Sequence, residues 1–255
     1  MGLKWKRMIS GGLAVFALAC VFYAYCIYHG YLLLNNPSRK QYPIVGADLS
    51  HYQGEIDWEV LAQENIEFVF IKATEGSSHV DSRFAENWSG VERTDLKYGA
   101  YHFFSFDSPG ETQAENFISQ VTRQPEMLPP VVDVEYYGDK KNNRPDGQAV
   151  REQLQIMLDM LQRHYQVTPI LYCTEEMWND YLDGYFEQYP LWIRNVFTKP
   201  RISESWMFWQ YTNRARLDGY AGNEEFIDLN VFCGDQKEWE EWVELQMQKT
   251  ESAYP

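Results

Sequence analysis

Two carboxylates stand one residue apart in the segment Val131-Val-Asp-Val-Glu135. The valines predict a strand, and because side chains alternate between the faces of a strand, Asp133 and Glu135 share a face with Val131. Burial and a close like charge raise the pKa of one member of such a pair, which keeps a proton donor beside a charged carboxylate near neutral pH. The segment therefore predicts acid–base chemistry, although an Asp-x-Glu at a strand end is, by itself, also typical of an exposed structural position.

Two further acids occupy similar positions. Asp48 lies at the end of a predicted strand in Gly46-Ala-Asp-Leu-Ser, and Asp228 lies in Phe226-Ile-Asp-Leu-Asn-Val-Phe232. If the first and last strands are neighbours in a closed sheet, both acids join Asp133 and Glu135 at one mouth, which suits cleavage through an oxocarbenium-like transition state. Taken singly, Asp48 is equally compatible with a helix cap and Asp228 with an Asx turn, and clustered carboxylates also suit calcium. The four together favour a catalytic site.

Aromatic residues on or just after the predicted strands indicate a saccharide ligand, because sugar rings stack on aromatic planes. We expect Phe103 and Trp209 to pack between sheet and helices. No Cys-x-x-Cys or His-x-x-x-His spacing is present, and we expect no metal and no cofactor. The residues expected to contact substrate are Tyr101, Trp192, Tyr136, Tyr52 and Tyr211.

Eight short β-rich runs must position these side chains. They are Ile44–Asp48, Phe68–Lys72, Tyr98–Phe103, Val131–Glu135, Pro169–Cys173, Leu191–Arg194, Trp206–Gln210 and Glu225–Leu229. The spacers between the first five are long enough for crossover helices, at Trp58–Ile66, Arg83–Leu96, Glu111–Arg123 and Gly147–Tyr165.

The later spacers are shorter, so the last strands should include antiparallel pairs. We therefore predict an α/β fold: an irregular TIM-like barrel of eight strands, with five β/α units followed by mostly β closure. A terminal helix, Lys237–Gln248, is expected to pack Trp239, Trp242 and Leu245 against it.

The N-terminus predicts a membrane segment. A basic cluster, Lys4-Trp-Lys-Arg7, precedes an uncharged and mostly apolar stretch from Met8 to about Asn36, long enough to cross a bilayer. We expect residues 1–36 to form a cytoplasmic N-terminus and an uncleaved signal anchor, 37–42 a tether, and 43–255 a catalytic domain outside the membrane. A cleaved signal, with Ala17-Leu-Ala-Cys20 resembling a lipoprotein site, remains an alternative that would release the domain.

The net charge of the chain beyond the apolar stretch excludes one class of binding partner. Residues after position 40 carry 17 basic and 37 acidic side chains, a net charge of −20, which repels nucleic-acid phosphates. We expect no nucleic-acid partner and a monomer. Cys173 and Cys233, the thiols outside the apolar stretch, are expected to be two separate buried thiols, although a disulfide between them is an alternative.

Five stretches, in order, resemble the glycoside hydrolase family 25 lysozymes, the Chalaropsis and phage-endolysin type. They cover roughly residues 43 to 234. Ala47, where many relatives have Val or Ile, and the N-terminal anchor depart from the family pattern. The stretches are Gly46-Ala-Asp-Leu-Ser-His-Tyr-Gln-Gly54 with Ile56-Asp-Trp58, Phe70-Ile-Lys-Ala-Thr-Glu-Gly76, Gly99-Ala-Tyr-His-Phe-Phe104, Val131-Val-Asp-Val-Glu135, and Trp209-Gln-Tyr211 before Ile227-Asp-Leu-Asn230.

The resemblance implies a peptidoglycan hydrolase that cleaves the β-1,4 bond between N-acetylmuramic acid and N-acetylglucosamine. It implies that Glu135 is the general acid, that Asp133 stabilises charge beside the anomeric carbon, and that Asp48 and Asp228 flank them. A substrate acetamide or an enzyme carboxylate can each serve as the nucleophile of a retaining reaction. A non-catalytic peptidoglycan-binding protein and a hydrolase of another N-acetylated glycan, such as chitin, remain alternatives.

Overall fold

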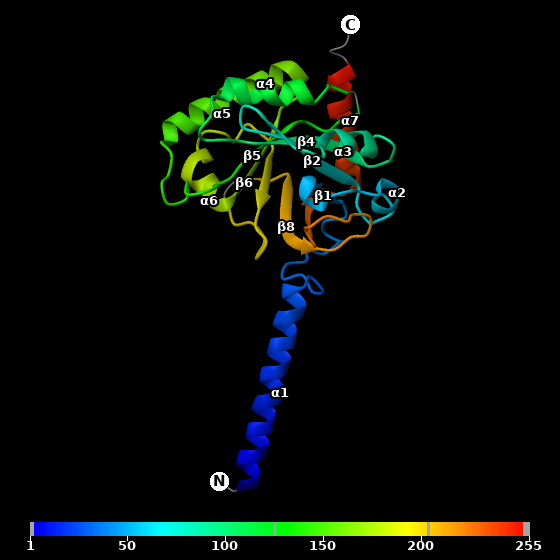
Figure 1. Cartoon of the computed structure of the whole chain (residues 1–255), viewed down its shortest axis with the longest axis vertical. Helices are drawn as coiled ribbons and strands as arrows, with labels where there is room; N and C mark the ends of the chain where they lie inside the picture. The colour runs from blue at the N-terminus through cyan, green and yellow to red at the C-terminus, as the bar shows by residue number, and fades with distance from the viewer. Residues whose placement is uncertain (1–2, 125, 203–204, 252–255) are drawn as a thin grey trace.

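The computed structural model describes residues 3–124, 126–202 and 205–251. A long N-terminal helix, α1 (Leu3–Tyr28), projects from a rounded domain that contains all the strands (Figure 1). The window Ile9–Tyr28 of α1 has a mean hydropathy of 1.9 and is almost entirely free of contact with the domain. By length and composition this helix can span a membrane.

Eight strands close into a barrel, which confirms the predicted fold class. In barrel order they are β1 (Val45–Leu49), β2 (Phe68–Glu75), β4 (Lys97–Phe103), β5 (Val131–Val134), β6 (Ile170–Thr174), β7 (Leu191–Arg194), β8 (Phe208–Ala215) and β9 (Ile227–Phe232). Neighbours from β1 to β8 run parallel, whereas β9 is antiparallel to both β8 and β1. The expected antiparallel closure is therefore confined to β9. A two-residue strand, β3 (His79–Val80), extends the far end of β2.

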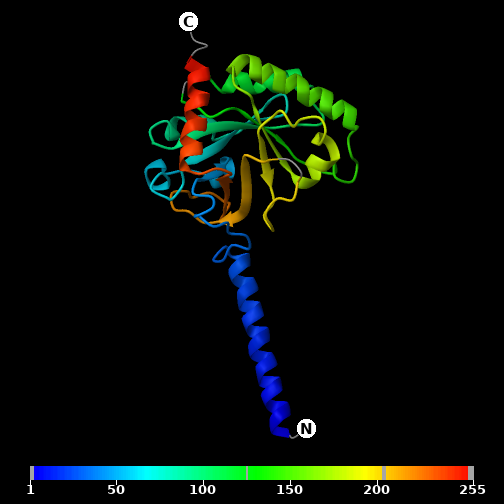
Figure 2. The same ribbon diagram turned by 180° about the vertical axis from the view of Figure 1, so that it is seen from behind.

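Helices cover the outside of the barrel (Figures 1 and 2). They are α2 (Trp58–Leu61), α3 (Phe84–Val91), α4 (Gly110–Gln120), α5 (Gly147–Tyr165), α6 (Glu175–Met177) followed by a π-helical turn η2 (Trp178–Leu182), and α7 (Gln236–Glu251). The apolar stripe predicted for α5 is buried, from Leu154 to Leu161, and the Asp146 carboxylate caps this helix by accepting from the Ala149 N–H at 2.9 Å. A single 3₁₀ turn, η1 (His51–Gln53), follows β1.

Alternation divides the apolar core into two layers. Val132 and Val134 of β5 belong to the layer between barrel and helices. Val131 belongs to a second layer, here called the inner plug, in which large rings such as Phe70 and Phe208 fill the inside of the barrel. Among the residues of α7, Trp239 and Val243 are buried against this plug. Leu245 is 48 % exposed, so its predicted packing is wrong.

Most strand boundaries differ from the predicted ones by one or two residues, and the last two strands extend well beyond them. β8 continues to Ala215 and β9 to Phe232, with register irregularities along their pairing. Cys173 and Cys233 are both free thiols; Cys173 is buried, but Cys233 is exposed, so the expectation of two buried thiols is wrong for Cys233.

Candidate active site

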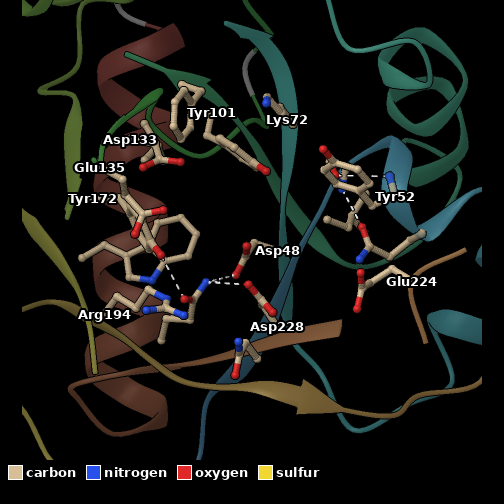
Figure 3. Close-up of a pocket in the computed structure, with 18 of the residues that line it drawn as sticks. Asp48, Tyr52, Lys72, Tyr101, Asp133, Glu135, Tyr172, Arg194, Glu224 and Asp228 are labelled. Carbon is tan, nitrogen blue, oxygen red and sulfur yellow. Dashed lines mark hydrogen bonds between the residues drawn. The ribbon is translucent and has the colours of Figure 1, made fainter. Parts of the chain in front are cut away.

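A cavity of about 500 Å³ opens where the parallel strands end, and all four predicted acids line it. Figure 3 shows Asp133 and Glu135 together on one side, near Tyr172 and Arg194, with Asp48 and Asp228 side by side beyond them. The carboxyl ends of the strands form the active face of α/β barrels. The strand-end placement expected from the sequence is therefore present for the four acids.

The pair on β5 has few protein partners. Asp133 is the third residue of the strand, and Glu135 follows directly after its end. Asp133 is only 8 % exposed, and its Oδ1 atom is buried without a hydrogen-bond partner among the described residues. A buried acceptor without a donor is costly in a folded protein. The Asp133 oxygen is thus a site to which a substrate donor can bind.

Burial shifts the acidity of this pair. It raises the pKa of the Asp133 carboxyl well above its usual range; the charge of Glu135 raises it further, and Lys72 and Arg194 lower it. Burial also raises the pKa of Glu135, which Arg194 lowers and Asp48 raises. A carboxyl group with a raised pKa is available as a proton donor near neutral pH.

Asp48 and Asp228 form a second pair with a different environment. They face each other across the antiparallel pairing of β1 and β9. The Gln210 side-chain amide donates to Asp48 Oδ2 at 2.9 Å and to Asp228 Oδ2 at 3.1 Å, and the Asn230 amide donates to Asp48 Oδ2 at 2.8 Å. Burial raises the pKa of both carboxyls, and for Asp48 these amide donors oppose the rise.

The two bridging amides are themselves held in place. Tyr172 donates its hydroxyl hydrogen to Gln210 Oε1 at 2.9 Å, and the Trp192 indole N–H donates to Asn230 Oδ1 at 2.8 Å. These four residues are almost fully buried. Each amide is therefore oriented by an aromatic donor behind it, so that its N–H group points at the carboxylates.

Two cations complete the pocket. Arg194, at the end of β7, lines the cavity and lowers the pKa of Glu135 and Asp228. Lys72 lines the cavity from β2; its Nζ lies 2.7 Å from Glu75 Oε2 and 5.1 Å from the centroid of the Phe103 ring. They partly balance the four acids, which lets buried carboxyls lie close together.

Only some of the aromatic residues that were expected to contact substrate line the pocket. Tyr101 and Tyr52 line it, and Tyr52 is 60 % exposed at its rim. Trp192 also lines it, but it is 2 % exposed and its N–H is already bonded, so it forms part of the floor.

Two tyrosines expected to contact substrate do not line the cavity, and we correct their placement. Tyr136 lies outside the cavity lining, donates to Asp180 at 2.7 Å and packs against Tyr181. Tyr211 is buried in the outer core beside Trp209. Trp209 packs outside the barrel as predicted, but Phe103 lines the cavity, so its assignment to packing alone is wrong.

Several pocket residues were missed from the sequence. Arg194 shares a strand face with Trp192, and Lys72 shares one with Phe70, so alternation would have found both. Gln210, which lines the cavity, and Asn230, which donates to Asp48, lie in the motifs Trp-Gln-Tyr and Ile-Asp-Leu-Asn, whose spacing alone indicates no role for them. Glu224 and Phe226 precede β9 and line the cavity through a loop whose path the sequence does not indicate.

Within residues 3–124, 126–202 and 205–251, no group of three or more His, Cys, Asp or Glu is arranged to hold a metal ion. The Gln210 amide bridges Asp48 and Asp228, and Arg194 and Lys72 line the cavity beside the acids.

Comparison with known proteins gives consistent matches. Residues 47–220 match the family model described as Glycosyl hydrolases family 25. The solved structure of a family 25 glycosyl hydrolase from Bacillus anthracis is 49 % identical, with a TM-score of 0.77 over 81 % of this chain and 96 % of its own. Uncharacterized protein YegX of Escherichia coli (strain K12) is 32 % identical over 80 % of this chain and 74 % of its own. Lysozyme M1 of Streptomyces globisporus is 29 % identical over 75 % and 68 %, respectively.

Proposed function

The chain belongs to glycoside hydrolase family 25, and from this premise we propose how its pocket works on peptidoglycan. The chain is a lysozyme-type glycoside hydrolase, a muramidase, as its relatives named lysozyme and its barrel support. The bond it cleaves is the β-1,4 bond between N-acetylmuramic acid and N-acetylglucosamine. The assignment of roles rests on the buried Asp133 oxygen beside Glu135, which has no hydrogen-bond partner among the described residues.

Glu135 is the proton donor in this proposal. It lies at the cavity wall, and burial holds its pKa above the usual value. Protonation of the departing sugar oxygen is required because an alkoxide is a poor leaving group. Arg194 limits the rise in pKa, so that the group can still give up its proton during each turnover.

Asp133 has a separate role. Its Oδ1, which no donor in the described part of the chain reaches, is an acceptor that the N–H of a substrate acetamide can satisfy. An acetamide held in this way turns its carbonyl oxygen toward the anomeric carbon. The oxygen bonds to that carbon as the glycosidic C1–O4 bond breaks and O4 takes the proton of Glu135. Water then attacks the same carbon, the bond to the acetamide oxygen breaks, and the water proton returns to Glu135. Two successive displacements at one carbon give net retention of configuration. We therefore favour the substrate's acetamide over an enzyme carboxylate as nucleophile.

The second acid pair and the aromatic rim complete the site. Asp48 and Asp228 are fixed by Gln210 and Asn230, so their charge stabilises the positive character that develops at the sugar ring. Tyr52 and Tyr101 offer ring faces to neighbouring sugars. The roles of all these residues are part of the proposal.

We propose that the enzyme works outside the cytoplasm as a single-pass membrane protein and as a monomer. The apolar window Ile9–Tyr28 is long enough for one crossing, and the basic residues before it favour a cytoplasmic N-terminus. A tether confines cleavage to nearby wall, which suits local remodelling better than killing at a distance.

The proposal is tested with Glu135→Gln. We expect this variant to fold normally and to release no detectable new reducing ends from purified peptidoglycan, whereas Glu115→Gln, an exposed change on α4, remains fully active. Mass spectrometry of digests of defined muropeptides and of chitooligosaccharides identifies the bond. A fully active Glu135→Gln would overturn the acid assignment, and preferential cleavage of chitooligosaccharides would overturn the substrate.

A further inference from the structure

The end of α1 is bound to the same end of the barrel that carries the pocket. Arg214, near the end of β8, donates from its guanidinium to the carbonyl of Tyr28, and Arg216 donates to the carbonyl of His29 at 2.8 Å. In both views the tip of β8 lies beside the point where α1 meets the domain (Figures 1 and 2). The membrane helix and the active-site mouth therefore lie on one side of the domain.

One side chain, Phe226, belongs to both the junction and the pocket. Its ring lies under the guanidinium groups of Arg214 and Arg216, each 5.1 Å from the ring centroid, and it also lines the cavity. Gly30 is packed so closely here that a Cβ atom would come within 2.8 Å of the Phe226 ring and 2.4 Å of the Arg214 carbonyl oxygen. The φ of Gly30 is +68°, a conformation that favours glycine. Phe226 thus lies between the anchor segment and the substrate cavity.

The chain after Gly30 continues along the rim of the barrel. Leu33 packs against the outer core, and the Asn35 side-chain amide donates to the carbonyl of Asn195 at 3.4 Å. Asn195 directly follows Arg194 of the pocket. Residues 28–35 are therefore attached at both the β8–β9 side and the β7 side of the mouth, which limits rotation of the domain about α1.

The length of the apolar window predicts that the junction lies at the height of the lipid head groups. The window Ile9–Tyr28 has 20 residues, which at ~1.5 Å per residue gives roughly 30 Å, the thickness of the hydrocarbon layer. Gly30 follows only two residues later. Tyr25, Tyr28 and Tyr31 are all more than half exposed around this point, as aromatic residues at a membrane interface are.

The charge of the domain does not explain its closeness to the membrane. The chain beyond residue 40 carries a net charge of −20, which opposes adsorption to anionic lipids. The bonds and close contacts at Tyr28, His29 and Gly30 instead fix the mouth beside the end of α1.

From this placement we infer that the substrate is the membrane-proximal end of the glycan: a strand still joined through its reducing end to a lipid pyrophosphate in the same bilayer. This inference rests on the proposed muramidase function. In the cleavage, water supplies the hydroxyl to C1 of N-acetylmuramic acid on the released strand. The O4 of N-acetylglucosamine on the lipid-linked stub takes the proton. A glycan joined to a lipid in the same bilayer begins at head-group level, where the length of α1 places the mouth.

The test uses the full chain in vesicles that contain an un-crosslinked glycan polymer on its polyprenyl pyrophosphate. The key variant carries a Gly-Ser spacer of ~12 residues between Tyr28 and His29, which adds a reach on the order of 20 Å while retaining the membrane helix. Mass spectrometry measures the length of the glycan stub left on the lipid. We expect wild type to leave short stubs, and the spacer to shift the most abundant stub by at least one disaccharide.

A pair of glycine variants tests the contact itself. Gly30→Ala pushes against Phe226, whereas Gly184→Ala also places a Cβ at positive φ but meets no heavy atom within 4 Å. We expect longer stubs from Gly30→Ala and wild-type stubs from Gly184→Ala. Wild-type stubs from the spacer variant would overturn the inference. Failure of wild type to cut soluble peptidoglycan would instead overturn the proposed function.

Discussion

The two pairs of acids in the pocket differ in what the protein offers them. Asp48 Oδ2 accepts two amide hydrogens, and Asp228 shares one of those amides, whereas Asp133 Oδ1 has no partner among the described residues. All four carboxyls are buried enough to raise their pKa. The difference indicates that one pair is fixed by the protein and the other is left open for the substrate.

An open buried carboxyl group destabilises the folded chain. Buried polar groups are normally satisfied, and exceptions are concentrated at functional sites, where stability is lost in favour of activity. In this pocket the exception lies on β5, and the satisfied pair lies on β1 and β9. The comparison therefore predicts opposite responses of stability to mutation on the two sides of the cavity.

The largest effect is expected on the open side. Asp133→Asn keeps the shape of the side chain but removes the charge that orients an acetamide, so kcat should fall about 10²–10³-fold. The same change removes a buried carboxyl group whose pKa is raised by burial, so the free energy of unfolding at neutral pH should rise. Initial rates of reducing-end release and urea unfolding measure the two effects.

If Asp133→Asn lowers both kcat and the free energy of unfolding, the result contradicts this account. Glu115→Gln, exposed on α4, is the control and should change neither quantity.

On the fixed side, a change of similar shape should act in the opposite direction. Asn230→Leu leaves Asp48 with one donor fewer and the Trp192 N–H without an acceptor. Each unpaired buried group costs about 1–3 kcal/mol, so the free energy of unfolding should fall by a few kcal/mol. Urea unfolding beside Asn143→Leu, which removes an exposed amide, measures the difference. Equal stability of the two variants would show that the Asn230 amide does not stabilise the folded chain.

The smallest effect is a pH dependence. Because burial raises the folded-state pKa of Asp133, its contribution to stability is fully present below the unfolded pKa of about 3.9 and is lost as pH rises through the folded pKa. Asp133→Asn cannot titrate, so its stability advantage over wild type should grow from about pH 4 to neutrality. Unfolding curves at several pH values test this, and a constant difference would contradict it.

His102 also titrates with a shifted pKa, but it does not affect the difference in stability between wild type and Asp133→Asn. Burial lowers the pKa of His102 to about 4, so its contribution is present above an unfolded pKa of about 6.5 and is lost as pH falls toward 4. Its ring nitrogens are hydrogen-bonded to Thr74 Oγ1 and Gln113 Oε1 in a buried network. Since wild type and Asp133→Asn share it, its effect cancels in the difference between them.

Alternation and motif order predicted much of this pocket from the sequence. The period of two in Val131-Val-Asp-Val-Glu135 placed Asp133 inside and Val132 outside, and the closed barrel brought Asp48 opposite Asp228. The same rule would have excluded Tyr211, because Gln210 points inward and its neighbour must point outward.

Other features of the pocket depend on tertiary contacts, which the alternation of side chains along a strand does not determine. Tyr136 follows the end of β5, where alternation no longer applies, and turns toward Asp180. The loop that brings Glu224 and Phe226 to the cavity has no regular pattern. The amide bridge of Gln210 between two acids depends on the register of β8, β9 and β1, which only the closed barrel fixes.

The central claim is that Glu135, on the open side of the cavity, donates the proton. The most direct test compares Glu135→Gln on the natural glycan and on an aryl glycoside whose dinitrophenolate departs without protonation. The account predicts kcat/KM reduced about 10²–10⁴-fold on the glycan and close to the wild-type value on the aryl glycoside. Equal losses on both substrates would contradict it.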